Sequence, residues 1–187
     1  LLMSINLSAR QFTADGLTWR LEQIVRESGL SPHAVAFEIT ETVLMENPEA
    51  VAPQLEHLRS LGFHLYLDDF GTGYSSLSYL HRFPISTLKI DRSFVTRMHD
   101  TGKETDITRA IIQLAHNLGM GVTAEGVETA EQLARLRDMN CGCVQGNLIS
   151  RPVSAERAET LLSDTSVLEL KTPGDDLCRL ADGKGSS

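Results

Sequence analysis

The sequence has few cysteines and histidines, the residues that are typical of zinc sites and of disulfide-bonded secreted proteins. Only three cysteines occur among its 187 residues, and Cys141, Cys143 and Cys178 form neither an even set nor a zinc-ligand spacing. The six histidines are scattered and also lack a metal-ligand spacing. These shortages argue against a zinc site and against a framework of disulfides.

Basic residues and long apolar runs are also scarce. The chain has 17 Lys and Arg against 25 Asp and Glu, a formal net charge of −8, which argues against a long nucleic acid as partner. No stretch approaches the roughly 20 apolar residues of a membrane span, and Leu1-Leu2-Met3 is too short for the core of a signal peptide. We therefore expect a cytoplasmic domain, with any tether to a membrane or sensor protein supplied by a longer parent.

Short apolar segments and amphipathic stretches alternate along most of the chain. Apolar residues repeat at helical spacing over 17–25, 107–118 and 133–139. Asn47 followed by Pro48 predicts the start of a helix, and Thr129 with Gln132 predicts a capping box at the start of another. Around these stretches lie six segments with the pattern of buried strands. They are Met3–Leu7, Val35–Thr40, His64–Phe70, Thr87–Asp91, Gly121–Val127 and Cys143–Ser150.

This alternation predicts an α/β fold, in which helices cover a parallel sheet as in a TIM-like β/α barrel. A closed barrel of this kind needs eight strands and typically about 250 residues, so we expect an incomplete barrel with about six of the eight strands. After about Ser163 the pattern gives way to Asp, Thr, Gly and Lys. We expect the barrel domain over residues 1–162 and a polar tail, linker or disordered segment over 163–187.

Each predicted strand places apolar side chains in one phase and a polar side chain in the other. Successive side chains of a strand point to opposite faces, so the polar ones would share the face away from the helices. They are Asn6, Glu38, Asp68, Lys89, Glu125 and Gln145. All lie near the carboxyl ends of their strands, where β/α barrels hold their active sites. The pattern predicts a polar site at that rim.

Several carboxylates at one rim require cations. Two carboxylates about 4 Å apart repel by roughly 4 kcal/mol at an effective dielectric near 20. The predicted ligands offer oxygen and no sulfur or imidazole, which favours hard ions such as Mg²⁺ or Mn²⁺. Adjacent Asp68 and Asp69 can serve one site where the strand breaks, as at 70–73, and together they suit two-metal activation of water against phosphorus. Lys89 suits holding or deprotonating that water, or neutralising phosphate charge.

The run Asp69-Phe70-Gly71 also occurs in protein kinases. A kinase would need a Gly-rich phosphate loop, a His-Arg-Asp catalytic loop and a two-lobed length, and the sequence has none of these. It also lacks the Gly-x-x-x-x-Gly-Lys-Ser/Thr phosphate loop. The kinase interpretation is therefore set aside.

Six motifs follow one another along the chain, at residues 6–12, 37–41, 68–73, 88–91, 124–129 and 145–146. In order and spacing, this series resembles that of the EAL-domain cyclic-di-GMP-specific phosphodiesterases, over about Met3 to Pro152. The resemblance implies hydrolysis of cyclic di-GMP to linear pGpG with two Mg²⁺ or Mn²⁺ ions. It also implies roles for individual residues.

The implied metal ligands come from four of the motifs. By resemblance, Asn6, Glu38 and Asp68 match ligands of the first ion, and Asp68 is shared with the second. Asp69 matches a ligand of the second ion, and Glu125 matches a further carboxylate of the metal site.

The remaining implied roles concern the reacting water and the loop after the third strand. Lys89 matches the lysine beside the nucleophilic water, and Glu128 and Gln145 match residues that support that network. Glu41 matches a glutamate that steadies the loop at 68–73, through which members of the family are associated as dimers. The resemblance thus also implies a possible homodimer through this loop region.

The sequence departs from the family pattern at its start. The Glu-Ala-Leu signature, whose glutamate is a metal ligand in the family, should precede Asn6, as should two strands. We therefore expect an N-terminally truncated domain from a longer parent protein with upstream sensory domains. We also expect that this parent protein is an active enzyme or descends from one. The alternatives are a catalytically silent EAL module that binds cyclic di-GMP or a protein partner without turnover, and a β/α scaffold with no ligand.

Overall fold

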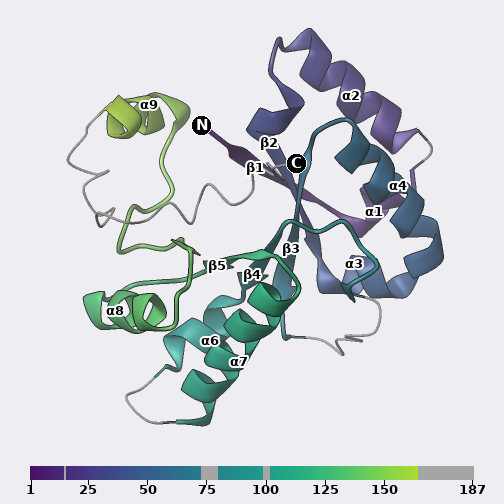
Figure 1. The fold of residues 1–187 in the computed structure, drawn as a ribbon. Helices are drawn as coiled ribbons and strands as arrows, with labels where there is room; N and C mark the ends of the chain where they lie inside the picture. The colour runs from purple at the N-terminus through teal and green to yellow at the C-terminus, as the bar shows by residue number, and fades with distance from the viewer. Residues whose placement is uncertain (15, 73–79, 99–101, 164–187) are drawn as a thin grey trace, which may run out of the picture. The chain divides into compact units, whose positions relative to one another are not determined.

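The computed structural model describes residues 1–14, 16–72, 80–98 and 102–163, which divide into two compact units. Unit 1 comprises Leu1–Lys89 and Asn117–Met120, and unit 2 comprises Ile90–His116 and Gly121–Ser187. Strands and helices alternate along both units (Figure 1). The strands follow one another in the sheet in sequence order, β1-β2-β3-β4-β5-β6.

Unit 1 contains four of the strands. They are β1 (Met3–Leu7), β2 (Val35–Thr40), β3 (His64–Phe70) and β4 (Thr87–Ile90), of which Ile90 alone belongs to unit 2. The helices of unit 1 are α1 (Ala9–Phe12), α2 (Leu17–Glu27), a short 3-10 helix (Pro32–Ala34), α3 (Glu41–Glu46) and α4 (Pro48–Ser60). The pairs β1–β2 and β2–β3 run parallel, with Asn6 opposite Glu38 and Thr40 opposite Asp68.

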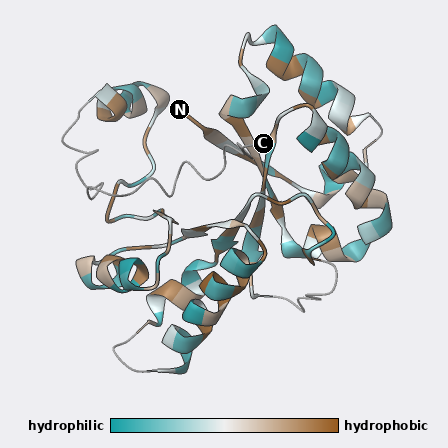
Figure 2. Cartoon of the chain, in the orientation of Figure 1, coloured by the Kyte–Doolittle hydropathy of each residue, from teal (hydrophilic) through white to brown (hydrophobic). Residues whose placement is uncertain are grey.

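The core of unit 1 lies between its strands and the apolar faces of its helices. Phe37 of β2 and Leu65 and Leu67 of β3 are almost fully buried, as are Leu55 and Leu58 of α4. Figure 2 shows α2 and α4 with hydrophobic residues along one side and hydrophilic residues along the other. The apolar repeat predicted for α2 is only partly buried, since Ile24 is 61% exposed.

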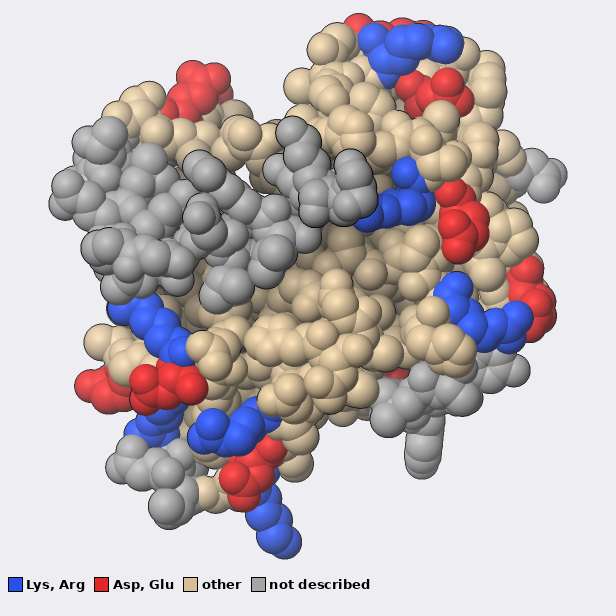
Figure 3. All heavy atoms as spheres, viewed as in Figure 1, with Lys and Arg blue, Asp and Glu red and all other residues tan. Residues whose placement is uncertain are grey.

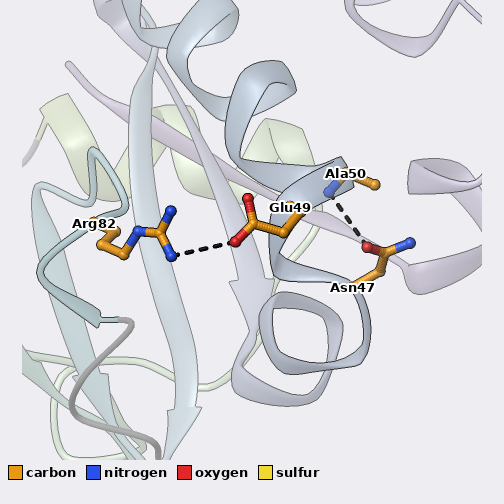
Figure 4. A network of polar contacts seen from close by, with 4 residues as sticks. All are labelled: Asn47, Glu49, Ala50 and Arg82. Carbon is orange, nitrogen blue, oxygen red and sulfur yellow. Dashed lines mark hydrogen bonds and ion pairs between the residues drawn. The ribbon is translucent and has the colours of Figure 1, made fainter.

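The start of α4 shows how local sequence fixes a helix end. Asn47 caps the helix by accepting a hydrogen bond from the backbone N–H of Ala50 at 3.3 Å, and Pro48 occupies the first helical position (Figure 4). Glu49 in the first turn also forms an ion pair with Arg82 at 3.2 Å. Both partners are largely exposed, so this pair contributes at most about 1 kcal/mol.

Unit 2 contains short strands and several helices. They are α6 (Arg92–Thr96), α7 (Lys103–Asn117), β5 (Gly121–Ala124), α8 (Ala130–Asp138), β6 (Cys143–Val144) and α9 (Ala155–Ser163). Of these residues, Asn117 alone belongs to unit 1. The pair β5–β6 runs parallel. Thr129 and Gln132 form the capping box of α8 that the sequence predicts. Residues 164–187 of the predicted tail lie outside the described residues, and Ser163 ends α9.

The predicted fold class is confirmed: the topology is that of an incomplete TIM-like β/α barrel with six strands. The predicted extents of the last two strands are wrong. β5 stops at Ala124 and β6 at Val144, whereas the sequence pattern extends to Val127 and Ser150. Gly126 has a φ of 69°, a left-handed conformation that cannot continue a strand, so Glu125 lies in a turn.

The surface chemistry agrees with the composition. On the face shown in Figure 3, acidic and basic side chains are interspersed and do not form a basic patch among the described residues. No described helix is long and apolar enough to cross a membrane.

Candidate active site

Three charged side chains of unit 1 lie close together on one face of the sheet. The ammonium Nζ of Lys89 on β4 lies 2.7 Å from Oε2 of Glu38 on β2 and 3.2 Å from Oδ1 of Asp68 on β3. The relative exposures of the three residues are 3%, 5% and 8%. Because neighbouring parallel strands place equivalent phases on one face, three strands bring these side chains together, as the strand pattern predicts for this part of the set.

One lysine cannot neutralise all the acid that surrounds it. Glu38 and Asp68 carry two negative charges against the single charge of Lys89, and a carboxylate oxygen of Asp69 lies within 4.8 Å of one of Asp68. Oδ1 of Asp68 is buried and has no hydrogen-bond partner among the described residues. It is held in an ion pair whose geometry is not that of a hydrogen bond. This oxygen-rich donor set, short of positive charge, fits a hard divalent cation.

The backbone of β3 departs from regular strand geometry at Asp69, and a carboxylate oxygen of this residue lies within 4.8 Å of one of Asp68. The φ of Asp69 is 54°, which is uncommon for a residue with a side chain, although it lies within β3. The sequence argument placed the break in the glycine-containing run that follows, but the backbone already departs from regular strand geometry at Asp69. Thr72 closes the turn, since its Oγ1 donates to the carbonyl of Asp69 at 2.9 Å.

Glu41 contacts the loop after β3. It is buried at the start of α3, and its Oε2 accepts a hydrogen bond from the backbone N–H of Gly71 at 3.2 Å. Oε1 of Glu41 has no hydrogen-bond partner among the described residues. The contact with Gly71 agrees with the loop-supporting role that the resemblance implies. Gly73, the end of the predicted dimerisation region, lies outside the described residues.

Asn6 is in register with Glu38 but is far less enclosed. Residues 3–6 of β1 are exposed, and only Leu7 of that strand is buried. Ile5, expected in the apolar phase against the helices, is 43% exposed. The predicted phase therefore holds for the backbone of β1, but no described element buries this part of the strand.

The other three predicted site residues belong to unit 2. Glu125 is half-buried in the turn after β5, Glu128 is exposed before α8, and Gln145 is exposed directly after β6. Backbone bonds fix these loops: the N–H of Gln145 donates to Ala124 at 2.8 Å, and the N–H of Glu125 donates to Ile90 at 3.1 Å. The structure thus groups Glu125, Glu128 and Gln145 in one unit, and the ion-paired carboxylates and Lys89 in the other.

Tyr66 is not among the site residues that the sequence predicts. It lies two residues before Asp68 and opposite Glu38, so its side chain is in the same phase as the buried charges. Burial raises the pKa of Tyr66 above its ordinary value, with a smaller rise from the charge of Glu38, while a hydrogen bond with Thr87 and the charge of Lys89 lower it. The strand alternation contains this signal, but an aromatic residue in a strand is common enough to escape notice.

The position of the charged side chains on the parallel strands indicates the class of protein. Charged side chains at the carboxyl ends of parallel strands, with helices between the strands, are typical of β/α-barrel proteins that bind ligands at that rim. The chain belongs to the EAL domain family, whose model matches residues 1–152. The predicted family is therefore confirmed.

Named relatives and solved structures agree with this assignment. The chain is 42% identical over 162 residues to the cyclic di-GMP phosphodiesterase NbdA of Pseudomonas aeruginosa. The matched residues make up 87% of this chain and 21% of NbdA. It resembles the PaMucR phosphodiesterase in a c-di-GMP complex, with a TM-score of 0.81, 39% identity and coverage of 84% of this chain and 64% of that one.

A second similar structure is described with a metal. It is a manganese and cyclic di-GMP complex of BlrP1 from Klebsiella pneumoniae, with a TM-score of 0.75, 34% identity and coverage of 81% of this chain and 39% of that one. The chain spans about a fifth of the length of the curated relatives that it matches first.

Proposed function

We propose that this chain is part of a phosphodiesterase that hydrolyses cyclic di-GMP to linear pGpG with two divalent ions, Mg²⁺ or Mn²⁺. The observation that carries the proposal is the buried group of Glu38, Asp68 and Lys89, in which acid exceeds base beside Asp69. The choice of cyclic di-GMP as substrate is supported by the similar protein named as a cyclic di-GMP phosphodiesterase and by the similar structures in complex with cyclic di-GMP.

The proposed metal ligands are the oxygen-bearing residues of the predicted set, namely Asn6, Glu38, Asp68, Asp69 and Glu125. When bound, the ions would supply a more acidic water and polarisation of the phosphodiester. The protein's own part is to hold the carboxylates at fixed positions. Lys89 does so for Glu38 and Asp68, because its ammonium contacts both.

The remaining residues are proposed to act around the reacting water. The buried ammonium of Lys89 is a charged hydrogen-bond donor, suited to holding that water or stabilising phosphate charge. Glu128 and Gln145 are proposed to support the same network, and Glu41 to steady the loop after β3. Homodimerisation through the region 68–73, upstream sensory domains and a cytoplasmic location stay predictions.

Turnover tests the proposal directly. The purified chain is incubated with cyclic di-GMP and Mn²⁺ or Mg²⁺, and pGpG is followed by chromatography beside an Asp69→Asn variant. Asparagine keeps the shape of the side chain and tolerates positive φ, so loss of turnover in the variant reports the missing charge. Turnover that survives in Asp69→Asn would remove this aspartate from the proposed site.

A second candidate is a silent EAL module that binds cyclic di-GMP or a protein partner. It is favoured by the direct contact of Lys89 with both Glu38 and Asp68, which partly compensates these carboxylates without a cation. Titration calorimetry with cyclic di-GMP in Mn²⁺ separates the two functions. Binding without pGpG formation supports the silent module, and the absence of binding supports a scaffold without ligand.

A further inference from the structure

The side chain of Gln132 joins three backbone groups of unit 2. Its Oε1 accepts hydrogen bonds from the N–H of Glu128 at 2.8 Å and from the N–H of Thr129 at 3.1 Å. Its Nε2 donates to the carbonyl of Val95, in α6, at 3.3 Å. One half-buried amide thus connects the loop before α8 to a helix 37 residues earlier in the chain.

Helix capping accounts for only part of this pattern. In the capping box, Oγ1 of Thr129 accepts from the N–H of Gln132 at 3.2 Å, and Gln132 returns the bond to the N–H of Thr129. The bonds to Glu128 and Val95 lie outside that reciprocal pair. Both fix the path of the loop relative to α6, which a cap alone does not require.

Glu128 is held from a second side. Nδ2 of Asn147, two residues after Gln145, donates to Oε1 of Glu128 at 3.4 Å, a long hydrogen bond between exposed groups. The shorter backbone bond to Gln132 is therefore the stronger restraint on the position of Glu128. Without the hydrogen bond to Gln132, the backbone of Glu128 would no longer be held. Only the weaker side-chain hydrogen bond from Asn147 would then orient the carboxylate.

We propose that Gln132 is a positioning residue that fixes Glu128 and the loop carrying it against α6, and so sets the efficiency of turnover beyond its part in capping α8. This inference rests on the proposed function, because it assumes that Glu128 supports the reaction. Gln132 acts through Glu128 and is not a catalytic residue.

Two substitutions separate positioning from capping. Gln132→Met removes every hydrogen bond of the amide at similar length, whereas Thr129→Ala removes the other half of the capping box and leaves the bonds of Gln132 to Glu128 and Val95 available. Kinetics with cyclic di-GMP at saturating Mn²⁺ are measured beside urea unfolding. We expect kcat/KM to fall about tenfold in Gln132→Met and to stay within about twofold in Thr129→Ala, at a similar loss of stability. Equal losses of kcat/KM in the two variants would overturn the proposal.

A readout independent of turnover completes the test. Amide exchange at Glu128, followed by NMR, should accelerate in Gln132→Met and remain slow in Thr129→Ala. Gln132→Glu retains the acceptor for both N–H groups and should restore most of this protection. Unchanged exchange at Glu128 in Gln132→Met overturns the proposal whatever the activity. Absence of turnover in the unaltered chain instead overturns the proposed function.

Discussion

The two units hold their proposed site residues by different means. In unit 1 all of these residues except Glu41 of α3 lie on strands of four to seven residues, and the buried carboxylates of Glu38 and Asp68 both pair with buried Lys89. In unit 2 the strands have four and two residues, and the proposed site residues lie in the turns that follow them. There the restraints are backbone bonds, a cap and close-packed glycines.

Because of this difference, we expect different kinds of substitution to destabilise the two units. In unit 1 charge and stability are coupled, because removing one member of a buried ion pair leaves the others uncompensated. In unit 2 the exposed side chains of Glu128 and Gln145 can change with little effect on folding, whereas the backbone positions beneath them cannot. Four measurements test whether the two units differ in this way.

The largest effect is expected from Lys89→Ala. The sequence alone suggests loss of turnover with folding largely kept, but the burial of Lys89 between two carboxylates changes that expectation. We expect urea unfolding in EDTA to show a loss of about 3–5 kcal/mol. Mn²⁺ should restore part of it. Lys103→Ala, at an exposed position of α7, should stay within about 0.5 kcal/mol. Equal stability of the two variants would show that the contact with Lys89 does not contribute to folding.

A smaller effect is expected from the buried thiol of unit 2. Burial raises the pKa of Cys141 from 9.0 to about 11, against hydrogen bonds with backbone groups that lower it. The unfolded chain loses this proton first as the pH rises, so the folded state becomes less stable between about pH 9 and 11, by up to about 3 kcal/mol. Urea unfolding at pH 7.5, 9 and 10.5 measures the slope. Cys141→Ala should have a shallower slope, and an identical slope would contradict the assignment.

Gly146→Ala tests the backbone restraint of unit 2. A Cβ at this position would overlap the backbone of Val127, which lies one residue after the turn glycine, so the loops carrying Glu128 and Gln145 must separate. We expect a loss of about 1–3 kcal/mol in urea unfolding. Gly102→Ala is the control, because a Cβ there comes no closer than 3.7 Å to another group. A tolerated Gly146→Ala would show that this close approach is not required.

The smallest effect is expected from Tyr66→Phe in unit 1. The change removes the hydrogen bond with Thr87 beside the buried charges and should cost about 1 kcal/mol in urea unfolding. A double-mutant cycle with Thr87→Val measures the pair directly. Additive losses in the cycle would show that the two hydroxyl groups do not interact.

Sequence reasoning succeeds where local pattern and structure coincide. The bounds of β1, β2 and β3 match the predicted segments, and Asn47, Thr129 and Gln132 cap the helices that they were expected to cap. Alternation along the strands also places Glu38, Asp68 and Lys89 on one face of the sheet before any geometry is known, because the alternation of side chains is a property of the strand itself.

It fails where contacts between distant segments decide. β5 and β6 end early because Gly126 turns the chain and Gly146 packs on Val127, and neither event has a signal in hydropathy. The bond from Gln132 to Val95 joins residues 37 positions apart, so the sequence shows the cap but not the link. The direct pairing of Lys89 with its carboxylates likewise depends on three strands at once.

The left-handed backbone at Asp69 has a consequence for how such a chain changes over generations. A non-glycine residue in that conformation carries a strain of about 1–3 kcal/mol, which glycine would relieve. A copy of this protein released from selection for its chemistry would therefore gain stability by losing that carboxylate. Under the proposed function, glycine at this position in a homologue would be a sign of lost activity, readable from the sequence without any assay.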